Sequence, residues 1–378
     1  MGSANNHSLL MIAASEKSPN LYYATKFLAP DAFIFFQIRG RKILMMSDLE
    51  LDRAKSQAEV DEVISTSKYA SEVKKELGRD PGMLDLIEHF LRQKKIKDLL
   101  VPGDFPLEYA DPLRRRGFKL TPKSEPFFEE RTYKTKDEIA KITQSLRHTE
   151  AAVDAAVKVL RESKIVKDRL IFDGSPLTSE FLKKVVNVKL MESNTVGEHT
   201  IISCGKDCVD PHNEGSGLIR PHTSIIMDVF PHSVDSRYYA DFTRTFVRGA
   251  ASPKLKKMYQ AVAHGQDIAF ERIRDGAEAS DIHNAIMAYF EKEGFKTGFM
   301  DGRMQGFFHG TGHGLGLEVH EPPRISKAKH ILRAGEVVTV EPGLYYLDAG
   351  GVRLEDLVVV EQKGMKNLTE YPRFLEIQ

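Results

Sequence analysis

Two aspartates, Asp228 and Asp241, each lie in an apolar, strand-like run, and a turn through Pro231–Arg237 joins the two runs. Strands joined in this way can place both carboxylates on one wall of a pocket. A buried carboxylate is costly unless a positive group meets it, and two that face each other resist joint ionisation. A pair of divalent cations would remove both costs. The alternative, one buried structural aspartate and one exposed aspartate in a hairpin, fits this stretch equally well.

A glycine-rich block carries three further candidates, His309, His313 and His320, within twelve residues. Its glycines let the backbone approach a ligand closely and keep His313 unobstructed. A single histidine is more often a hydrogen-bonded structural residue, but three in such a block favour a binding site. A phosphate-binding loop is a poor match, because the block lacks a Lys-Ser/Thr ending and a following helix signal.

Two glutamates at strand ends extend the set. Glu341 ends an apolar strand at a Pro-Gly turn, and Glu355 begins another. Each alone is better explained as a partly solvated acid, and Arg353, two residues before Glu355 on the same predicted strand, offers it a structural partner. The candidate ligands are therefore Asp228, Asp241, His313, Glu341 and Glu355. Four carboxylates and one imidazole suit two divalent ions, which together can activate water for hydrolysis. We expect Mn²⁺ in preference to Co²⁺ or Zn²⁺.

These motifs resemble those of the pita-bread metallopeptidases, the family of Xaa-Pro aminopeptidases, prolidases, methionine aminopeptidases and creatinase. The similar stretches are Asp228 with Ala240–Thr245, His309–His320, Glu341–Gly343 and Arg353–Asp356. The N-terminal region around Ala14–Tyr23 is similar to the extra domain of the proline-directed members, which methionine aminopeptidases lack. The resemblance implies an α+β protein with a creatinase-like α/β domain over residues 1–128 and a pita-bread catalytic domain over residues 129–378.

The resemblance also implies how the five ligands divide their work. Asp228 would chelate one metal ion, His313 and Glu341 would hold the other, and Asp241 and Glu355 would bridge the two. Glu341 would also accept the proton of the attacking water.

Five further residues take roles from the same resemblance. His212, in the loop before the first aspartate, and His320 would contact the substrate or the tetrahedral intermediate. One of these two would stabilise the oxyanion or protonate the leaving imide nitrogen. His309 would lie near the substrate, and Arg353 and Thr243 would fix the ligand carboxylates from behind.

The sequence departs from the family pattern in two places. Two extra residues lie between Asp228 and Asp241, and Val229-Phe230 replaces the usual Ala-Gly or Leu-Gly. Because the extra residues fall in the turn, we expect the ligand geometry to survive. The chain has no Trp, whereas some aminopeptidase members place a Trp from a neighbouring subunit at the pocket. We nevertheless expect a homodimer.

Several elements must position these residues. Alternating strand and helix signals before residue 128 predict a sheet with helices on its faces, with strands over 9–13, 33–38, 42–46 and 98–101 and helices over 57–77 and 83–92. Periodicity breaks over residues 121–134, which predicts the domain boundary. A capping box, Thr135 to Glu138, then begins a long helix. Further helices are expected over 178–189, 253–273 and 279–294, and a strand over 200–203.

Composition excludes several classes of partner. Lys+Arg and Asp+Glu both number 54, so the net charge is zero, which argues against nucleic acid or an anionic membrane as a partner. No apolar run approaches the ~20 residues that span a bilayer, and Ser8–Ala14 is interpreted as a strand instead of a signal segment. Cys204 and Cys208 could pair, but reduced thiols in a cytoplasmic protein are the preferred interpretation.

We therefore expect a metal-dependent exopeptidase that hydrolyses the Xaa-Pro bond of a dipeptide or of a peptide N-terminus. One alternative is another enzyme on this fold, a creatinase-like hydrolase or a lyase, and another is a metal-free binding module. Creatinase and the binding modules tend to lose the metal ligands, whereas all five are kept here. Dipeptidase and aminopeptidase activity both stay open, because the N-terminal domain would decide how far the pocket extends.

Overall fold

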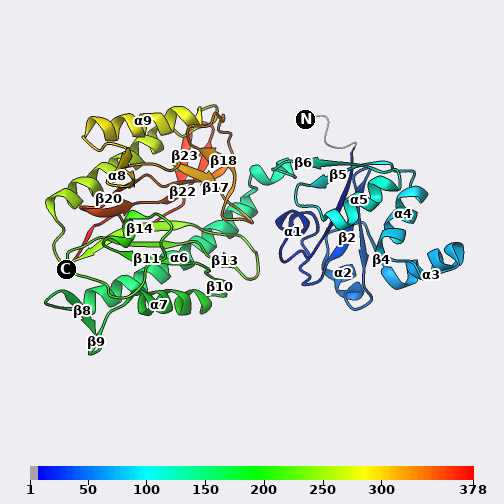
Figure 1. Cartoon of the computed structure of the whole chain (residues 1–378), viewed down its shortest axis with the longest axis horizontal. Coiled ribbons are helices and arrows are strands. Elements are labelled where there is room, and N and C mark those ends of the chain that lie inside the picture. Colours follow the sequence, from blue (N-terminus) through cyan, green and yellow to red (C-terminus); the bar gives the residue numbers. More distant parts are fainter. Residues whose placement is uncertain (1–6) are drawn as a thin grey trace. The chain divides into compact units, whose positions relative to one another are not determined.

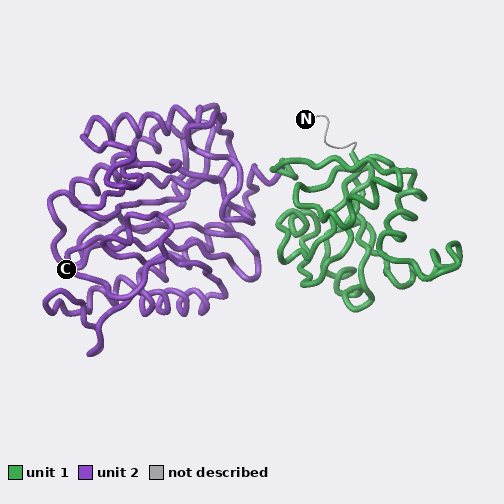
Figure 2. The backbone as a smooth tube through the Cα atoms, viewed as in Figure 1, with its two compact units in different colours: residues 1–129 green, residues 130–378 purple. Residues whose placement is uncertain are grey.

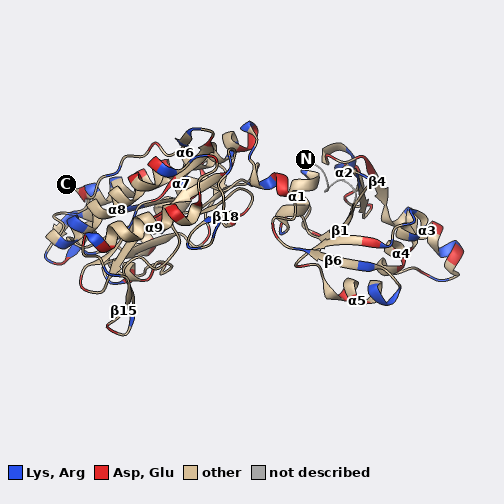
Figure 3. Ribbon diagram, turned by 90° about the horizontal axis from the view of Figure 1, so that it is seen from above, with Lys and Arg blue, Asp and Glu red and all other residues tan. Residues whose placement is uncertain are grey.

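The computed structural model describes residues 7–378 and divides the chain into two compact units (Figure 2). Unit 1 is Met1–Glu129 and unit 2 is Glu130–Gln378. Both signs of charge are interspersed along the helices and loops of each unit (Figure 3). Within residues 7–378, no helix is long and apolar enough to cross a membrane.

Unit 1 is built on a six-stranded sheet in the order β4-β3-β2-β1-β5-β6. Strands β1, β2 and β3 pair antiparallel, and the outer pairs are parallel. Alternate residues of β1 face two different cores, because successive side chains of a strand point to opposite faces of the sheet. Leu10 and Ile12 pack into one core, and Leu9 and Met11 pack into the other. The strands are β1 (Ser8–Ala13), β2 (Phe33–Ile38), β3 (Arg41–Met46), β4 (Glu62–Ser65), β5 (Asp98–Pro102) and β6 (Lys119–Lys123). The helices are α1 (Pro19–Thr25), α2 (Leu51–Gln57), α3 (Thr66–Leu77), α4 (Met83–Gln93) and α5 (Leu107–Arg115).

The single helix expected over residues 57–77 is wrong. Helix α2 ends at Gln57, and the edge strand β4 precedes α3. The apolar residues of this stretch fit a helical spacing, but Val63 and Ile64 are β-branched neighbours that fit a half-buried edge strand better. Ser65 then begins α3, because its hydroxyl accepts the Lys68 N–H at 3.1 Å.

Unit 2 places strands between two helix pairs (Figure 1). Helix α6 (Lys136–Glu162) packs against α7 (Ser179–Met191), and α8 (Pro253–Arg272) packs against α9 (Ala279–Lys292). The capping box at the start of α6 is confirmed, since Thr135 Oγ1 accepts the Glu138 N–H at 3.2 Å and the Glu138 carboxylate accepts the Thr135 N–H at 2.7 Å. Helices α8 and α9 share a core with alternate residues of the strands beside them, such as Val338, Val340, Val358 and Val360.

Two larger sheets of unit 2 carry the residues that concern function. One is four-stranded, in the order β11-β12-β14-β24, and the other is five-stranded, in the order β18-β17-β19-β22-β23. Their strands are β11 (Ile201–Cys204), β12 (Ile225–Val229), β14 (Phe242–Arg248), β24 (Glu376–Ile377), β17 (Gly312–Gly314), β18 (Glu321–Ile325), β19 (Val337–Val340), β22 (Asp356–Glu361) and β23 (Gly364–Asn367).

Shorter strands complete unit 2. They are β7 (Lys164–Val166), β8 (Arg169–Phe172), β9 (Ser175–Pro176), β10 (Thr195–Val196), β13 (His232–Ser233), β15 (Gly298–Met300), β16 (Arg303–Gln305), β20 (Gly343–Tyr346) and β21 (Gly350–Arg353). Short 3₁₀ turns lie at Glu129–Thr132 and Asp207–Val209. Cys204 and Cys208 are both free, and burial raises the pKa of the Cys208 thiol to about 11. The preferred interpretation of these two residues as thiols agrees with the structure.

Candidate metal centre

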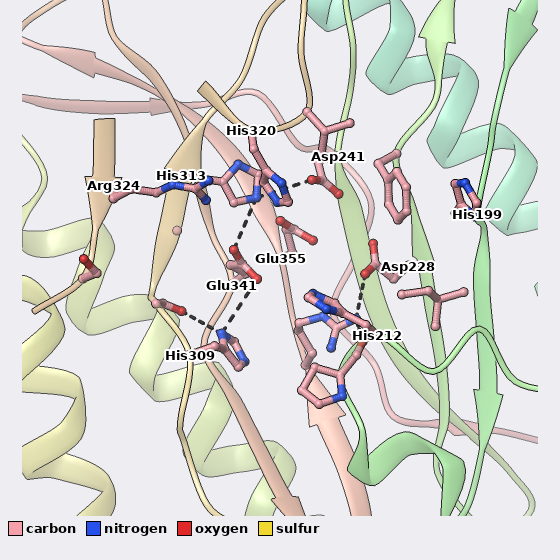
Figure 4. Close-up of a pocket in the computed structure, with 18 of the residues that line it drawn as sticks. His199, His212, Asp228, Asp241, His309, His313, His320, Arg324, Glu341 and Glu355 are labelled. Atoms are coloured by element: carbon pink, nitrogen blue, oxygen red, sulfur yellow. Dashed lines mark hydrogen bonds and ion pairs between the residues drawn. The ribbon is translucent and has the colours of Figure 1, made fainter. Parts of the chain in front are cut away.

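One cavity of about 780 Å³ in unit 2 collects nearly all the residues that the sequence singled out. Figure 4 shows their side chains converging on it from several strands and loops. The predicted residues that line the cavity are Asp228, Asp241, His313, Glu341, Glu355, His212, His309, His320 and Arg353. Thr243 lies behind the wall, where its hydroxyl contacts Glu355 and Arg353.

Three neighbouring strands align the carboxylates of one wall. Asp228 on β12 is the register partner of Thr243 on β14, and Thr243 in turn forms an isolated bridge with Glu355. Asp241 precedes Thr243 by two residues, so the two side chains emerge on the same face. The Thr243 hydroxyl donates to the Glu355 carboxylate at 2.6 Å. Residues distant in sequence thereby form one row across the sheets.

The opposite wall is fixed by the glycine-rich block. His313 lies on β17, and its N–H donates to Thr339 Oγ1 at 3.1 Å, while the Glu341 N–H donates to the carbonyl of Thr311 at 2.7 Å. A Cβ at Gly312 would lie 1.9 Å from the Thr339 carbonyl oxygen, so only glycine permits this approach. His313 Nε2 consequently lies 3.4 Å from Glu341 Oε1 and 3.6 Å from Asp241 Oδ2.

His313 has the protonation state of a metal ligand. Its Nδ1 lies 3.2 Å from the carbonyl oxygen of Gly314, which can only accept, so Nδ1 carries the proton. The lone pair of Nε2 then faces Asp241 and Glu341. Burial, helped by the nearby charges of His320 and Arg324, lowers the pKa of His313 to about 3, so the ring stays neutral. Such orientation by a second hydrogen bond is usual for histidines that bind metals.

The charge balance of the cavity fits divalent cations. Burial, together with the negative charge of neighbouring carboxylates, raises the pKa of Asp241 and of Glu355 well above the ordinary range. Burial likewise raises the pKa of Glu341 to about 7. Among residues 7–378, Asp228 Oδ1 and Asp241 Oδ1 are buried atoms with no hydrogen-bond donor. The ligand atoms of Asp241, His313 and Glu355 all lie within 4.8 Å of one another, which suits a shared ion.

Arg353 does not form the ion pair with Glu355 that the structural alternative predicts. The predicted strand is interrupted, because β21 ends at Arg353 and β22 begins at Asp356. The Arg353 guanidinium instead donates to Asp228 Oδ2 at 2.7 Å and to the Tyr345 hydroxyl at 2.9 Å. This leaves the other three carboxylates without a directly bonded cation among residues 7–378.

Three histidines surround this centre on the cavity side. The His320 ring lies 4.4 Å from that of His313, nearly perpendicular to it, and His212 lies in the loop after Asp210. His309 Nδ1 lies 2.8 Å from the Gly310 carbonyl and therefore carries the proton. Its Nε2, 2.9 Å from the Tyr345 hydroxyl, then accepts the hydrogen bond. His309 is thus a neutral ring in a fixed orientation.

Two residues that line or support the cavity were missed from the sequence. The exposed guanidinium of Arg324 lies on the cavity wall, opposite His313 in the register of β17 and β18, and makes no hydrogen bond or ion pair with any residue from 7 to 378. Tyr345 links Arg353 to His309. Both follow a motif residue by a few positions, but only the strand pairing shows that they return to the cavity. Phe230, which marks the departure from the family pattern, also lines the cavity.

The fold and the site together define a class of protein. Sheets enclosed by two helix pairs, with a carboxylate and imidazole centre between them, are the architecture of a pita-bread metallohydrolase. Residues 140–362 match metallopeptidase family M24. The chain therefore belongs to metallopeptidase family M24, and its buried cluster of Asp241, His313 and Glu355 fits the divalent metal ions that a metallopeptidase implies.

Curated relatives support this assignment along most of the chain. An Xaa-Pro dipeptidase of Pyrococcus horikoshii is 28% identical over 368 residues, which cover 95% of this chain and 92% of that protein. An Xaa-Pro dipeptidase of Pyrococcus furiosus is 31% identical over 247 residues, 65% of each chain.

Solved structures share the fold. The X-Pro aminopeptidase of Thermotoga maritima superposes with a TM-score of 0.81 at 21% identity, covering 99% of this chain and 98% of the other. The prolidase of Pyrococcus furiosus superposes with a TM-score of 0.77 at 24% identity, covering 97% of both. The predicted α+β pita-bread fold is confirmed.

Removing metal ions should lower the thermal stability of the protein. Ions that bind only the folded state stabilise it by about 2.7 kcal/mol at a hundredfold excess over Kd. For a unit of this size that corresponds to about 5–10 °C in Tm. Calorimetry of the protein loaded with Mn²⁺ and of the protein treated with a chelator measures the difference. Equal melting temperatures at saturating metal would contradict the assignment.

Proposed function

We propose that the protein is an Xaa-Pro exopeptidase that acts on dipeptides or peptide N-termini through two divalent ions, most readily Mn²⁺. The observation that carries the proposal is the gathering of Asp228, Asp241, His313, Glu341 and Glu355 in one cavity, in a chain similar over nearly its whole length to an Xaa-Pro dipeptidase. Asp241 and Glu355 would hold both ions. Asp228 would hold one, and His313 and Glu341 the other.

The residues of the chain divide the chemistry among them. When bound, the two ions supply an acidified water and offset the charge that develops on the attacked carbonyl. Glu341, a buried carboxylate at this centre, would accept the proton of that water. The nitrogen of the scissile bond is the ring nitrogen of proline, which carries no hydrogen and must gain one to leave, so a donor is needed beside it. His320 and His212, both exposed to the cavity, serve as that donor and as the hydrogen-bond donor to the carbonyl oxygen.

Arg324 favours dipeptides within this substrate class. Its guanidinium lies on the cavity wall without a carboxylate partner among residues 7–378. A dipeptide Xaa-Pro brings a free carboxylate, which a guanidinium can bind through two parallel hydrogen bonds. A longer peptide has an amide at that place. We assign residues 1–128 the role of a creatinase-like domain that limits substrate length, and we retain the homodimer as a prediction.

A substrate panel tests the proposal. Ala-Pro, Ala-Pro-amide, Ala-Pro-Ala and Ala-Ala are assayed with Mn²⁺, Co²⁺ and Zn²⁺, with metal content measured in parallel. We expect Ala-Pro to be the best substrate and Ala-Ala the poorest. The Arg324→Met variant should lose the preference for Ala-Pro over its amide, while the control Arg220→Met, which does not line the cavity, should keep it.

Three outcomes would contradict the proposal. Equal cleavage of Ala-Ala and Ala-Pro would remove the proline specificity. About two bound ions with no peptidase activity would favour another hydrolase or a lyase on this fold, and no bound metal under any loading condition would favour a binding module.

A further inference from the structure

A buried carboxylate outside the ligand set, Glu321, follows directly on His320. Its side chain is 5% exposed and accepts hydrogen bonds from two backbone N–H groups, that of Leu317 at 2.9 Å and that of Glu318 at 3.2 Å. Both groups belong to the loop that runs from β17 to His320. The carboxylate therefore binds back onto its own loop and closes it.

Close packing makes this closure specific. A Cβ at Gly316 would lie 2.9 Å from Glu321 Oε2, so the loop backbone fits directly against the carboxylate. The Gly316 N–H donates to the Glu318 carbonyl at 3.0 Å, and the Gly316 carbonyl accepts the Tyr239 N–H at 2.8 Å. The Leu315 N–H reaches the Val337 carbonyl only at 3.4 Å. Glu321 thus supplies much of the loop's hydrogen bonding.

Two buried cations hold Glu321 in place. Lys134 Nζ lies 3.0 Å from Glu321 Oε2, and Arg131 donates to Glu321 Oε1 and, at 2.9 Å, to the Glu318 carboxylate. The Lys134 and Arg131 side chains are only 2% and 5% exposed. Burial by itself raises the pKa of Glu321, but the two cations outweigh it and the pKa is lowered, so the carboxylate stays ionised. The Lys134 N–H also donates to the Gly335 carbonyl at 2.8 Å, which anchors this cation to the adjoining loop.

We infer that Glu321, held by Arg131 and Lys134, is a positioning residue that fixes His320 against the metal centre. The inference rests on the proposed role of His320 in the Xaa-Pro reaction. His320 is exposed to the cavity and lies across the ring of His313, so its own surroundings leave it free to turn. Its place is set by the residue that follows it. A displacement of about 1 Å at a catalytic group can cost about a hundredfold in rate.

The test compares Glu321→Gln with a matched control, Glu150→Gln. Glu150 is also a buried glutamate that binds one arginine, Arg147, and two backbone N–H groups, at 2.7 and 3.1 Å, but it does not line the cavity. Both variants should bind the same number of metal ions as the wild type and unfold cooperatively, with the larger loss of Tm in Glu321→Gln, because it leaves two buried cations without their carboxylate. Only Glu321→Gln should lower kcat, by about a hundredfold, with little change in KM.

A double variant identifies the route of the effect. If Glu321 acts through His320, Glu321→Gln should cost little further activity in a His320→Ala background. Losses that multiply would overturn the inference, as would a normal kcat in Glu321→Gln. If Glu321→Gln does not fold, Lys134→Met takes its place, because it removes one of the two cations and leaves the backbone bonds. A normal kcat in Lys134→Met would equally overturn the inference.

Amide hydrogen exchange separates this inference from the proposed function. Residues 315–320 should exchange faster in Glu321→Gln than in the wild type, and the Glu150→Gln control should leave them unchanged. Faster exchange with unaltered kcat would refute the positioning role and leave the proposed function standing. Wild-type protein that cleaves no Xaa-Pro peptide would refute the proposed function. Full activity in His320→Ala would refute the catalytic role of His320, and with it this inference, and would leave the Xaa-Pro activity standing.

Discussion

Replacing His313 by alanine should lower kcat/KM for an Xaa-Pro dipeptide by about a thousandfold or more, equivalent to at least about 4 kcal/mol of transition-state stabilisation. His313 is the one nitrogen ligand in the proposed set, and its Nε2 faces Asp241 and Glu341 at 3.6 and 3.4 Å. Without it, those carboxylates still repel each other but hold a metal ion less well. The protein should still unfold cooperatively, because alanine is tolerated in a short strand whose backbone bonds remain.

The control for this variant is His199→Ala. His199 also lines the cavity, but its side chain is 76% exposed and pairs with Glu214 at 2.9 Å. Its removal should change kcat/KM less than tenfold. Activity and metal content are measured on the same preparations by steady-state kinetics and elemental analysis. Near-normal activity with normal metal content in His313→Ala, or its failure to fold, would show that the ligand assignment is wrong.

Replacing Glu355 by glutamine should reduce the bound metal from about two ions per chain to about one and lower activity by at least about a hundredfold. Glutamine keeps the shape of the side chain and can still accept from the Thr243 hydroxyl, at 2.6 Å in the wild type. It loses the negative charge and one oxygen ligand. The ligands would then supply too little negative charge for two ions, so the more weakly bound ion should leave first.

The same variant has a second, independent readout. In the absence of metal, Glu355→Gln should raise Tm relative to the wild type, because one of several mutually repelling buried carboxylates is gone. Added Mn²⁺ should then raise Tm less than it does in the wild type. Glu336→Gln is the control, since Glu336 is fully buried but binds His330 outside the cavity. Two ions per chain with wild-type activity in Glu355→Gln would contradict the bridging role.

The candidate ligands could be predicted from sequence because each interrupts an apolar or glycine-rich run. Asp228 and Glu355 are charges where a strand calls for an apolar side chain, and His313 lies between glycines. Such conflicts with the local pattern concentrate at functional sites. The sequence pattern alone does not show which ligands face one another, because that depends on the register between strands that are far apart in the chain.

The partners that pattern does not give have the same origin. The alternative that paired Arg353 with Glu355 does not hold, because β21 ends at Arg353 and its guanidinium donates to Asp228, another of the predicted ligand carboxylates. Arg324 reaches the cavity wall only because β18 pairs with β17. The helix expected over residues 57–77 conceals the edge strand β4, because four half-buried residues satisfy either period. Each failure concerns a partner supplied by tertiary structure.

The row formed by Asp228, Thr243 and Glu355 ties together strands that lie 127 residues apart in the chain, since 355 − 228 = 127. Ions held by Asp228 and Glu355 would crosslink the ends of β12 and β22 across β14, and only when these strands are in register. The strands could not separate while the ions stay bound, so global unfolding of the loaded protein would have to wait for metal release. The loaded enzyme should accordingly resist proteolysis through slow unfolding, and a brief exposure to chelator should shorten its lifetime far more than it alters its secondary structure.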